Sequence, residues 1–155
     1  MRPLLTHSFF LLPTHSLTYS LHYCLFKGVA WVGDTGFFAS ANEGDLDGGS
    51  RGWTIFDPVQ GSVVWDSGNA LELEAVRVGH YPESRSENKG NEPENVFYSK
   101  FGNGKAYIFV LAERSNVVFV YDVTGENVLS PILLQTLVRE ILFIMDVLVQ
   151  QTRCR

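Results

Sequence analysis

The stretch Ala106-Tyr-Ile-Phe-Val-Leu-Ala-Glu-Arg-Ser-Asn-Val-Val-Phe-Val-Tyr-Asp122 indicates the fold class of this protein. It contains two runs, 106–112 and 117–122, in which aromatic and β-branched residues dominate. Such residues favour β-strands because their side chains pack well on a pleated surface. A short polar loop joins the two runs, so the stretch predicts a pair of antiparallel strands.

A second copy of this pattern lies earlier in the chain, in Phe37-Phe-Ala-Ser-Ala-Asn-Glu43 followed by Thr54-Ile-Phe-Asp57. In both copies one strand ends in Glu, a loop follows, and the next strand ends in an aromatic residue and Asp. The loop of the first copy is longer and spans 44–52. Antiparallel strands repeated at this spacing are typical of β-propeller blades, whereas in a β-sandwich the similarity would be a coincidence.

Further runs of the same type extend the predicted sheets. Trp53-Thr-Ile-Phe-Asp57 and Ser62-Val-Val-Trp-Asp66 flank a hairpin turn at 59–61, and Val96-Phe-Tyr-Ser99 is another strand candidate. We therefore predict a mainly β fold in which residues 29–124 form a partial β-propeller of about two antiparallel blades.

The two ends of the chain differ from this central β zone. Residues 1–28 are an ill-defined N-terminal segment, in which Arg2 followed by the apolar stretch 4–12 weakly resembles a signal peptide. Residues 125–155 predict a C-terminal amphipathic helix, because Ser130-Pro131 is a typical helix start and apolar residues recur at helical spacing after it. Charged residues within this segment argue against a membrane span.

Composition narrows the classes of function. The length of 155 residues fits one domain or part of a larger one, and 45% hydrophobic residues are enough for a core. The formal net charge of −5 argues against a nucleic-acid partner. Only Cys24 and Cys154 are present, which is neither a disulfide framework nor a zinc-binding pattern.

The loop Arg85-Ser-Glu-Asn-Lys-Gly-Asn-Glu-Pro-Glu-Asn95 is the strongest candidate for a functional site. It combines carboxylates and cations with Gly90, which permits unusual backbone angles, and Pro93, which holds the preceding residues extended. A loop so rich in fixed polar groups is typical of binding to a metal, an anion or a neighbouring loop. The alternative is an ordinary solvated surface loop.

Strand direction predicts which of the glutamates meet. In a blade of four antiparallel strands, the loop before the first strand and the loop after the second lie on the same side. Glu92 and Glu94 precede a predicted first strand, and Glu43 and Glu113 end predicted second strands. We therefore expect these four carboxylates to emerge at one end of the sheets.

Such an acidic cluster needs compensating charge, because unpaired carboxylates repel each other. In a structural interpretation, basic residues pair with the glutamates across the blades and hold the loops in register. In a functional interpretation the carboxylates bind Ca²⁺, which prefers oxygen ligands, while an arginine meets a phosphate ester. The candidate metal ligands are Glu43, Asp45, Glu92, Glu94 and Glu113, and the candidates for salt bridges or an anionic ligand are Arg51, Arg85, Lys89 and Arg114.

Several motifs in this order give the chain a family resemblance. They are Asn42-Glu-Gly-Asp45, Trp53-Thr-Ile-Phe-Asp57, Val64-Trp-Asp-Ser-Gly68, the 85–94 loop with Lys-Gly-Asn-Glu-Pro-Glu, Ala112-Glu-Arg114 and Val118-Phe-Val-Tyr-Asp-Val123. Together they resemble the choice-of-anchor I family of secreted or surface β-propeller proteins, over about residues 36–124. That family includes mesenchyme-specific cell-surface glycoprotein-like sequences and is similar to phytase-like and calcium-dependent alkaline-phosphatase-like propellers.

The resemblance implies an extracellular or cell-surface location. Because members of the family carry a full ring of blades, a chain with two blades, the second without its outer strand, is expected to be a fragment. The function we expect is that of a binding or interaction module with an acidic loop face that binds a divalent cation, Ca²⁺. The alternative is a calcium-dependent, phosphatase- or phytase-like esterase. The expected partner is an unknown protein or a small phosphorylated ligand, without contact to a membrane.

Overall fold

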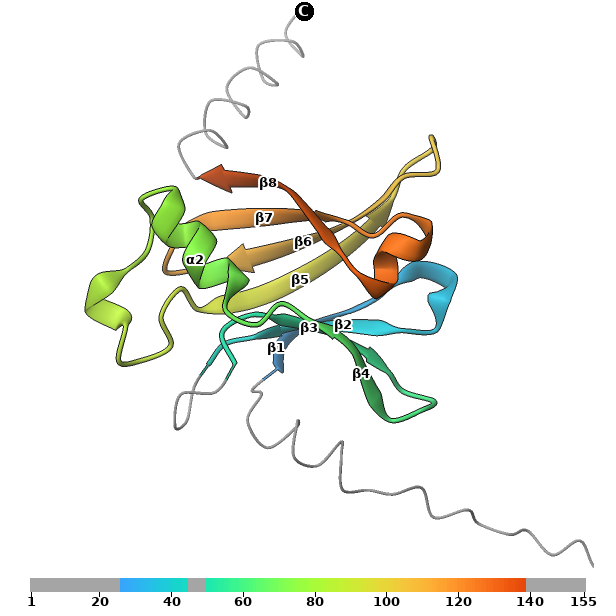
Figure 1. Cartoon of the computed structure of the whole chain (residues 1–155), viewed down its shortest axis with the longest axis horizontal. Helices are drawn as coiled ribbons and strands as arrows, with labels where there is room; N and C mark the ends of the chain where they lie inside the picture. The colour runs from blue at the N-terminus through green and yellow to red at the C-terminus, as the bar shows by residue number, and fades with distance from the viewer. Residues whose placement is uncertain (1–25, 45–49, 139–155) are drawn as a thin grey trace, which may run out of the picture.

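A computed structural model of the chain describes residues 26–44 and 50–138, and these form two four-stranded antiparallel sheets (Figure 1). In each sheet the strands lie side by side in the order of the sequence. The first sheet consists of β1 (Phe26–Trp31), β2 (Phe38–Asn42), β3 (Trp53–Asp57) and β4 (Ser62–Asp66). The second consists of β5 (Pro93–Lys100), β6 (Ala106–Ala112), β7 (Val117–Asp122) and β8 (Ile132–Val138).

Within residues 26–44 and 50–138, one α-helix and three short 3₁₀ helices connect the strands. The helix α2 (Ala70–Arg77) lies in the connection between the two sheets, and it was missed in the sequence. Its buried residues, Leu71 and Ala75, are one helical turn apart, which is the spacing that could have revealed it. The 3₁₀ helices are η1 (Gly33–Thr35), η2 (Glu83–Arg85) and η3 (Gly125–Leu129).

The internal repeat has a structural counterpart. The first copy forms β2 and β3, and the second copy forms β6 and β7, so both copies occupy the second and third positions of their sheets. Each sheet therefore contains the same antiparallel meander. The prediction of a mainly β fold is confirmed.

The predicted C-terminal helix is wrong for residues 132–138, which form strand β8 at the outer edge of the second sheet. Ser130 ends η3 instead of starting a helix, and Pro131 precedes the strand. A short apolar run is compatible with the periodicity of a helix and with that of a strand. Here it forms a strand, because it pairs with the edge of β7. The second sheet thus has the outer strand that the sequence analysis did not find. The rest of the predicted helix, from residue 139 on, lies outside the described residues.

The N-terminal boundary also shifts. Strand β1 begins at Phe26, so the β zone starts before residue 29, where the sequence placed it. The proposed signal-like stretch lies outside the described residues.

The core lies between the two sheets, where β1 and β2 pack against β5. Its largest member is Trp53, which is fully buried and whose ring centroid lies 4.7 Å from Trp65 and 4.9 Å from Tyr121 of the second sheet. Helix α2 is tied to the second sheet, because the Thr136 hydroxyl donates a 2.6 Å hydrogen bond to Glu74. These contacts hold the loops at one end of both sheets at fixed positions relative to each other.

Gly28 of β1 lies close to the backbone of the second sheet. A Cβ atom at this position would lie 2.6 Å from Cα of Asn95 and 2.8 Å from the Val96 backbone nitrogen, both in β5. We expect Gly28→Ala to lower the free energy of unfolding by about 1–3 kcal/mol, because the methyl group must push backbone aside. Urea denaturation measures this, with Gly102→Ala as control, where no atom lies within 4 Å of the added Cβ. Equal effects of the two substitutions would contradict the close approach.

Candidate functional site

The candidate site is built around Glu92, at the turn that leads into β5. Three residues of this turn have left-handed backbone angles: Lys89 (φ 65°), Gly90 (φ 57°) and Glu92 (φ 55°). This conformation is unfavourable for residues other than glycine, so surrounding contacts must hold Lys89 and Glu92 in place. One such contact is a backbone hydrogen bond of 2.9 Å from the Glu113 N–H group to the Glu92 carbonyl. It extends the pairing of β5 with β6 and brings Glu92 and Glu113 to the same end of the sheet.

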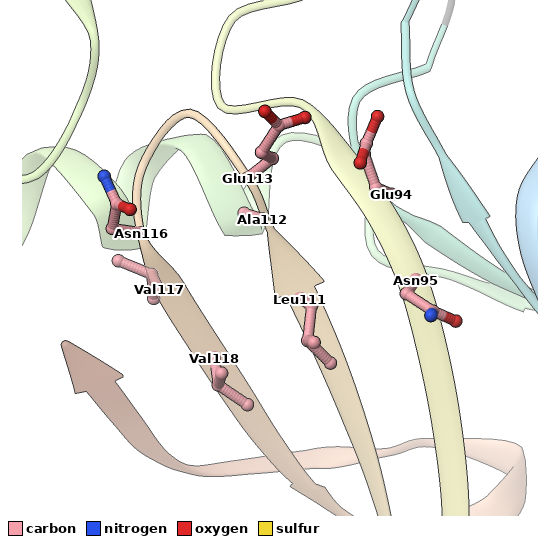
Figure 2. A pocket seen from close by; sticks show the side chains of 8 residues that line it. All are labelled: Glu94, Asn95, Leu111, Ala112, Glu113, Asn116, Val117 and Val118. Atoms are coloured by element: carbon pink, nitrogen blue, oxygen red, sulfur yellow. The ribbon is translucent and has the colours of Figure 1, made fainter. Parts of the chain in front are cut away.

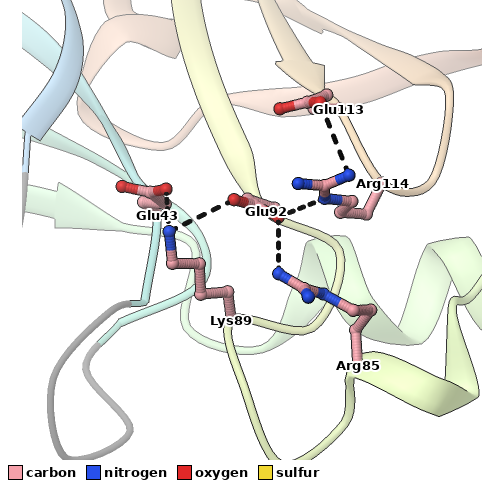
Figure 3. Close-up of polar contacts among 6 residues, drawn as sticks. All are labelled: Glu43, Arg85, Lys89, Glu92, Glu113 and Arg114. Atoms are coloured by element: carbon pink, nitrogen blue, oxygen red, sulfur yellow. Dashed lines mark hydrogen bonds and ion pairs between the residues drawn. The ribbon is translucent and has the colours of Figure 1, made fainter.

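Three cations surround the Glu92 carboxylate (Figure 3). The Nε atom of Arg114 lies 2.7 Å from Glu92 Oε2, and Arg85 Nη2 lies 3.5 Å from the same oxygen. The ammonium group of Lys89 lies 3.4 Å from Glu92 Oε1 and 2.6 Å from Glu43 Oε1. We call Glu43, Arg85, Lys89, Glu92 and Arg114 the ion cluster.

The ion cluster links the two sheets. Glu43 directly follows β2 of the first sheet, whereas Glu92 directly precedes β5 of the second sheet, and both side chains are almost fully buried. Lys89 bridges them, while Arg114 comes from the loop between β6 and β7. Because both carboxylates are buried, these ion pairs act at lower dielectric constant than pairs on the open surface.

Glu92 is held in its ionised form. Burial alone would raise its pKa, but hydrogen bonds from Arg114 and Lys89, together with the charge of Arg114, lower the pKa below the usual value of 4.5. A carboxyl group whose pKa is lowered by folding stabilises the protein above its unfolded-state pKa. That stabilisation is lost as the pH falls through the folded-state pKa.

This shift predicts an acid-sensitive contribution of Glu92 to stability. The difference in the free energy of unfolding between the wild type and Glu92→Gln should be constant above about pH 5 and should shrink as the pH falls below 4.5. Urea denaturation of both proteins at several pH values between 7 and 3 checks this. A difference that grows on acidification would mean that the pKa of Glu92 is raised instead.

The structure brings together part of the set of residues predicted from the sequence. Oxygen atoms of Glu43, Glu92 and Glu94 all lie within 4.8 Å of one another, at the end of the sheets where strand direction placed them. The backbone of Glu113 pairs with that of Glu92, but the Glu113 carboxylate contacts Arg114, at 3.7 Å. Asp45 lies outside the described residues.

Of the four predicted basic residues, Arg51 has a different set of contacts. Its Nη1 atom lies 3.2 Å from Glu72 of α2 and donates a 2.9 Å hydrogen bond to the Ser86 carbonyl. The Tyr81 hydroxyl donates a 3.0 Å hydrogen bond to the same Glu72 carboxylate. Glu72 was not recognised in the sequence because helix α2 was missed. Arg51, Glu72 and Tyr81 therefore brace the 85–95 loop from the side of α2.

An open pocket of about 390 Å³ lies beside the ion cluster, at the same end of the second sheet (Figure 2). Leu111, Val117 and Val118 give it an apolar surface, and the carboxylates of Glu94 and Glu113 stand at its rim. The complete lining is Glu94, Asn95, Leu111, Ala112, Glu113, Asn116, Val117 and Val118. The sequence analysis predicted the two glutamates but not the apolar surface beside them.

None of the helices in the described part of the chain has the length and hydrophobicity needed to cross a bilayer. Comparison with protein-family models matches residues 46–126 to the choice-of-anchor I domain. Comparison with curated proteins and with solved structures found no significant match.

Proposed function

The chain belongs to the choice-of-anchor I family, and from this premise we propose that it is a non-catalytic binding module. Domains of this family typically occur on cell-surface or extracellular proteins. The main support for a binding role is the pocket on the second sheet, which combines an apolar surface with an acidic rim. Its volume of about 390 Å³ is within the range of ligand pockets.

We infer that each sheet is one blade of a β-propeller. Support comes from the strand order, since each sheet is an antiparallel meander of four strands that follow the sequence. Further support comes from the face-to-face packing of consecutive sheets and from the repeat that links β2–β3 with β6–β7.

The ion cluster has a structural role in this proposal. Three cations, Arg85, Lys89 and Arg114, contact the buried carboxylates of Glu43 and Glu92. The cluster therefore fixes the loops that carry the pocket, in particular Glu94, which follows Glu92 by two residues. This corresponds to the interpretation in which basic residues hold neighbouring loops in register.

The chemistry of the pocket predicts the class of its ligand. An apolar surface binds an aliphatic or aromatic side chain, and carboxylates at the rim favour a basic group next to it. We propose that the ligand is a protein segment in which a lysine or arginine lies close to an apolar residue.

Two short peptides test this proposal. The peptide acetyl-Gly-Lys-Leu-Tyr-amide should shift the backbone amide NMR signals of Leu111, Glu113 and Val118, whereas the same peptide with Glu in place of Lys should not. Leu111→Asp should abolish the shifts, and Val63→Asp, at a similarly exposed position of β4, should leave them unchanged. Equal shifts with both peptides would reject the proposed ligand class.

A divalent cation is the second candidate ligand, at Glu43, Glu92 and Glu94. The 4.8 Å grouping of their oxygen atoms favours it, and carboxylates are suitable ligands for Ca²⁺. Against it stands Lys89, whose ammonium group already lies between Glu43 and Glu92 and would have to leave. The donor set therefore fits a resident cation poorly.

Calcium titration by calorimetry distinguishes the two interpretations. We expect no binding heat with the wild type, and weak binding with Lys89→Met, because this variant removes the competing charge but keeps the carboxylates. Lys105→Met is the control, because Lys105 is exposed and lies at the end of the second sheet opposite to the ion cluster. Wild-type heat that disappears in Glu92→Gln and Glu94→Gln would establish the calcium site instead. The esterase alternative requires this cation and depends on the same result.

A further inference from the structure

The loop between β5 and β6 is a tight hairpin turn that requires glycine at position 104. The Phe101 N–H donates a 2.8 Å hydrogen bond to the Lys105 carbonyl, and the Gly104 N–H donates a 2.9 Å hydrogen bond to the Phe101 carbonyl. Gly104 has a left-handed backbone angle (φ 80°), which is typical of the last residue of a short hairpin loop. Other residues are strained in this conformation, so the turn selects glycine here.

This requirement places a glycine directly after Asn103. Asn103 is the only asparagine of the chain that glycine follows. The backbone nitrogen after an asparagine can attack the side-chain amide carbon and close a five-membered ring, because the two groups belong to adjacent residues. A side chain on the following residue obstructs this approach, and Gly104 has none. The residue that the turn needs therefore also leaves the Asn103 amide open to attack.

The Asn103 side chain is oriented for this reaction. Its Oδ1 atom accepts a 3.0 Å hydrogen bond from the Lys105 N–H group, and this bond closes a ring that contains the Gly104 nitrogen. The same bond withdraws electron density from the side-chain carbonyl, which makes its carbon a better electrophile. The Gly104 N–H group is engaged with the Phe101 carbonyl, so the turn must open locally before the nitrogen can react.

The turn is placed where local opening is easy. Residues 101–105 are all exposed, and a Cβ atom added at Gly102 or Gly104 would have no atom of the described residues within 4 Å beyond its chain neighbours. Exposed loop tips with few packing contacts open at low free energy. The nearest packing is that of the Phe101 ring against Tyr107, with 5.6 Å between the centroids, and it involves the strands and not the tip.

We propose that Asn103 is a site of spontaneous deamidation. Base removes the amide proton of Gly104, and the nitrogen attacks Cγ of Asn103. A bond from this nitrogen to Cγ forms, the bond from Cγ to Nδ2 breaks, and Nδ2 takes up a proton from solvent and leaves as ammonia. Water then opens the cyclic imide at either carbonyl, which gives aspartate or isoaspartate. Water is the only co-reactant, and no group is oxidised or reduced.

The isoaspartate product changes the hairpin. It inserts the Cβ atom of residue 103 into the main chain, so the loop becomes one atom longer and the hydrogen bonds of Phe101 and Gly104 lose their geometry. The aspartate product keeps the main chain and an oxygen atom for the Lys105 N–H group. Isoaspartate therefore weakens the β5–β6 hairpin, whereas aspartate does not. The turn lies at the end of the second sheet opposite to the ion cluster, so the pocket stays intact.

Asn116 is the internal control for this reaction. It is also exposed and lies in the turn between β6 and β7, but it is followed by Val117, which is β-branched and buried. The full chain is incubated at mildly alkaline pH and mapped by mass spectrometry. Deamidation at Asn103 should be at least roughly tenfold faster than at Asn116, because the valine side chain obstructs attack. Equal rates at the two residues would overturn the proposal.

The products test the mechanism. Isoaspartate is identified by enzymatic transfer of a labelled methyl group from S-adenosylmethionine. The aged wild type should accept this label and Asn103→Ser should not, because serine cannot form the cyclic imide. Direct hydrolysis of the amide gives aspartate alone, so a deamidated residue 103 without isoaspartate would reject the cyclic route.

Urea denaturation tests the effect on the hairpin. The fraction of the aged protein that contains isoaspartate should unfold at a lower urea concentration than the fresh wild type, whereas freshly prepared Asn103→Asp should unfold like the fresh wild type. Unfolding of all three at the same urea concentration would show that the hairpin is not weakened.

The lysine peptide separates this inference from the proposed function, on which it does not depend. The peptide should bind to the fresh and the aged protein equally, because the turn is remote from the pocket lining. Absence of binding to both would reject the proposed ligand class alone. Binding that is lost on ageing would contradict an effect confined to the hairpin.

Discussion

Trp53→Ala is expected to lower the free energy of unfolding by about 3–5 kcal/mol, the largest effect of any single substitution considered for this protein. Trp53 has no exposed surface, and its ring contacts Trp65 in its own sheet and Tyr121 in the other. Removing the indole would leave a cavity at the junction of the two sheets. Because a domain of this size has a total stability of roughly 5–15 kcal/mol, the variant should lose a large share of its stability.

Urea denaturation followed by tryptophan fluorescence and circular dichroism measures this change. Trp31→Ala provides the control, because Trp31 is 65% exposed and its ring meets Phe38 edge-on. We expect a loss of less than about 1 kcal/mol for Trp31→Ala. Similar losses for both tryptophans would contradict the placement of Trp53 between the sheets.

Glu92→Gln is expected to lower the free energy of unfolding by about 3 kcal/mol. Its side chain is 3% exposed, and the substitution removes the charge that Arg114, Lys89 and Arg85 share. Glutamine keeps the size of the side chain, so the loss reports charge and not volume. The expected loss lies at the lower end of the range for removing one partner of a buried ion pair. The reason is that Arg85 and Arg114 are partly exposed and can be hydrated in the variant.

Glu113→Gln is the matched control for this prediction. Glu113 is 48% exposed, contacts Arg114 at 3.7 Å and should cost less than about 1 kcal/mol when neutralised. Both variants are compared at pH 7 by urea denaturation. If Glu92→Gln were as mild as Glu113→Gln, the ion cluster would not be the link between the sheets.

Much of the candidate site could be predicted because strand direction follows from local sequence. Glu43 ends a run of strand-forming residues, and Glu92 precedes one, so their meeting at one end of antiparallel strands required only the correct strand order. Lys89 was one of the predicted salt-bridge candidates, but its pairing with both glutamates depends on the left-handed backbone of the turn before β5. The contacts of Arg51 could not be foreseen, because they depend on helix α2, whose short apolar pattern was not recognised.

The amino-acid sequence by itself determined the β class, the repeated pair of strands and the end of the sheets at which the acidic residues gather. These properties depend on residue type and on alternation along the chain, which act over a few residues. Only the tertiary structure decided that Ile132–Val138 is a strand, that Glu92 is buried among three cations, and that one apolar face of the second sheet is exposed. Each of these depends on which distant segment provides the hydrogen bonds, charges or covering surface, and local sequence does not contain that information.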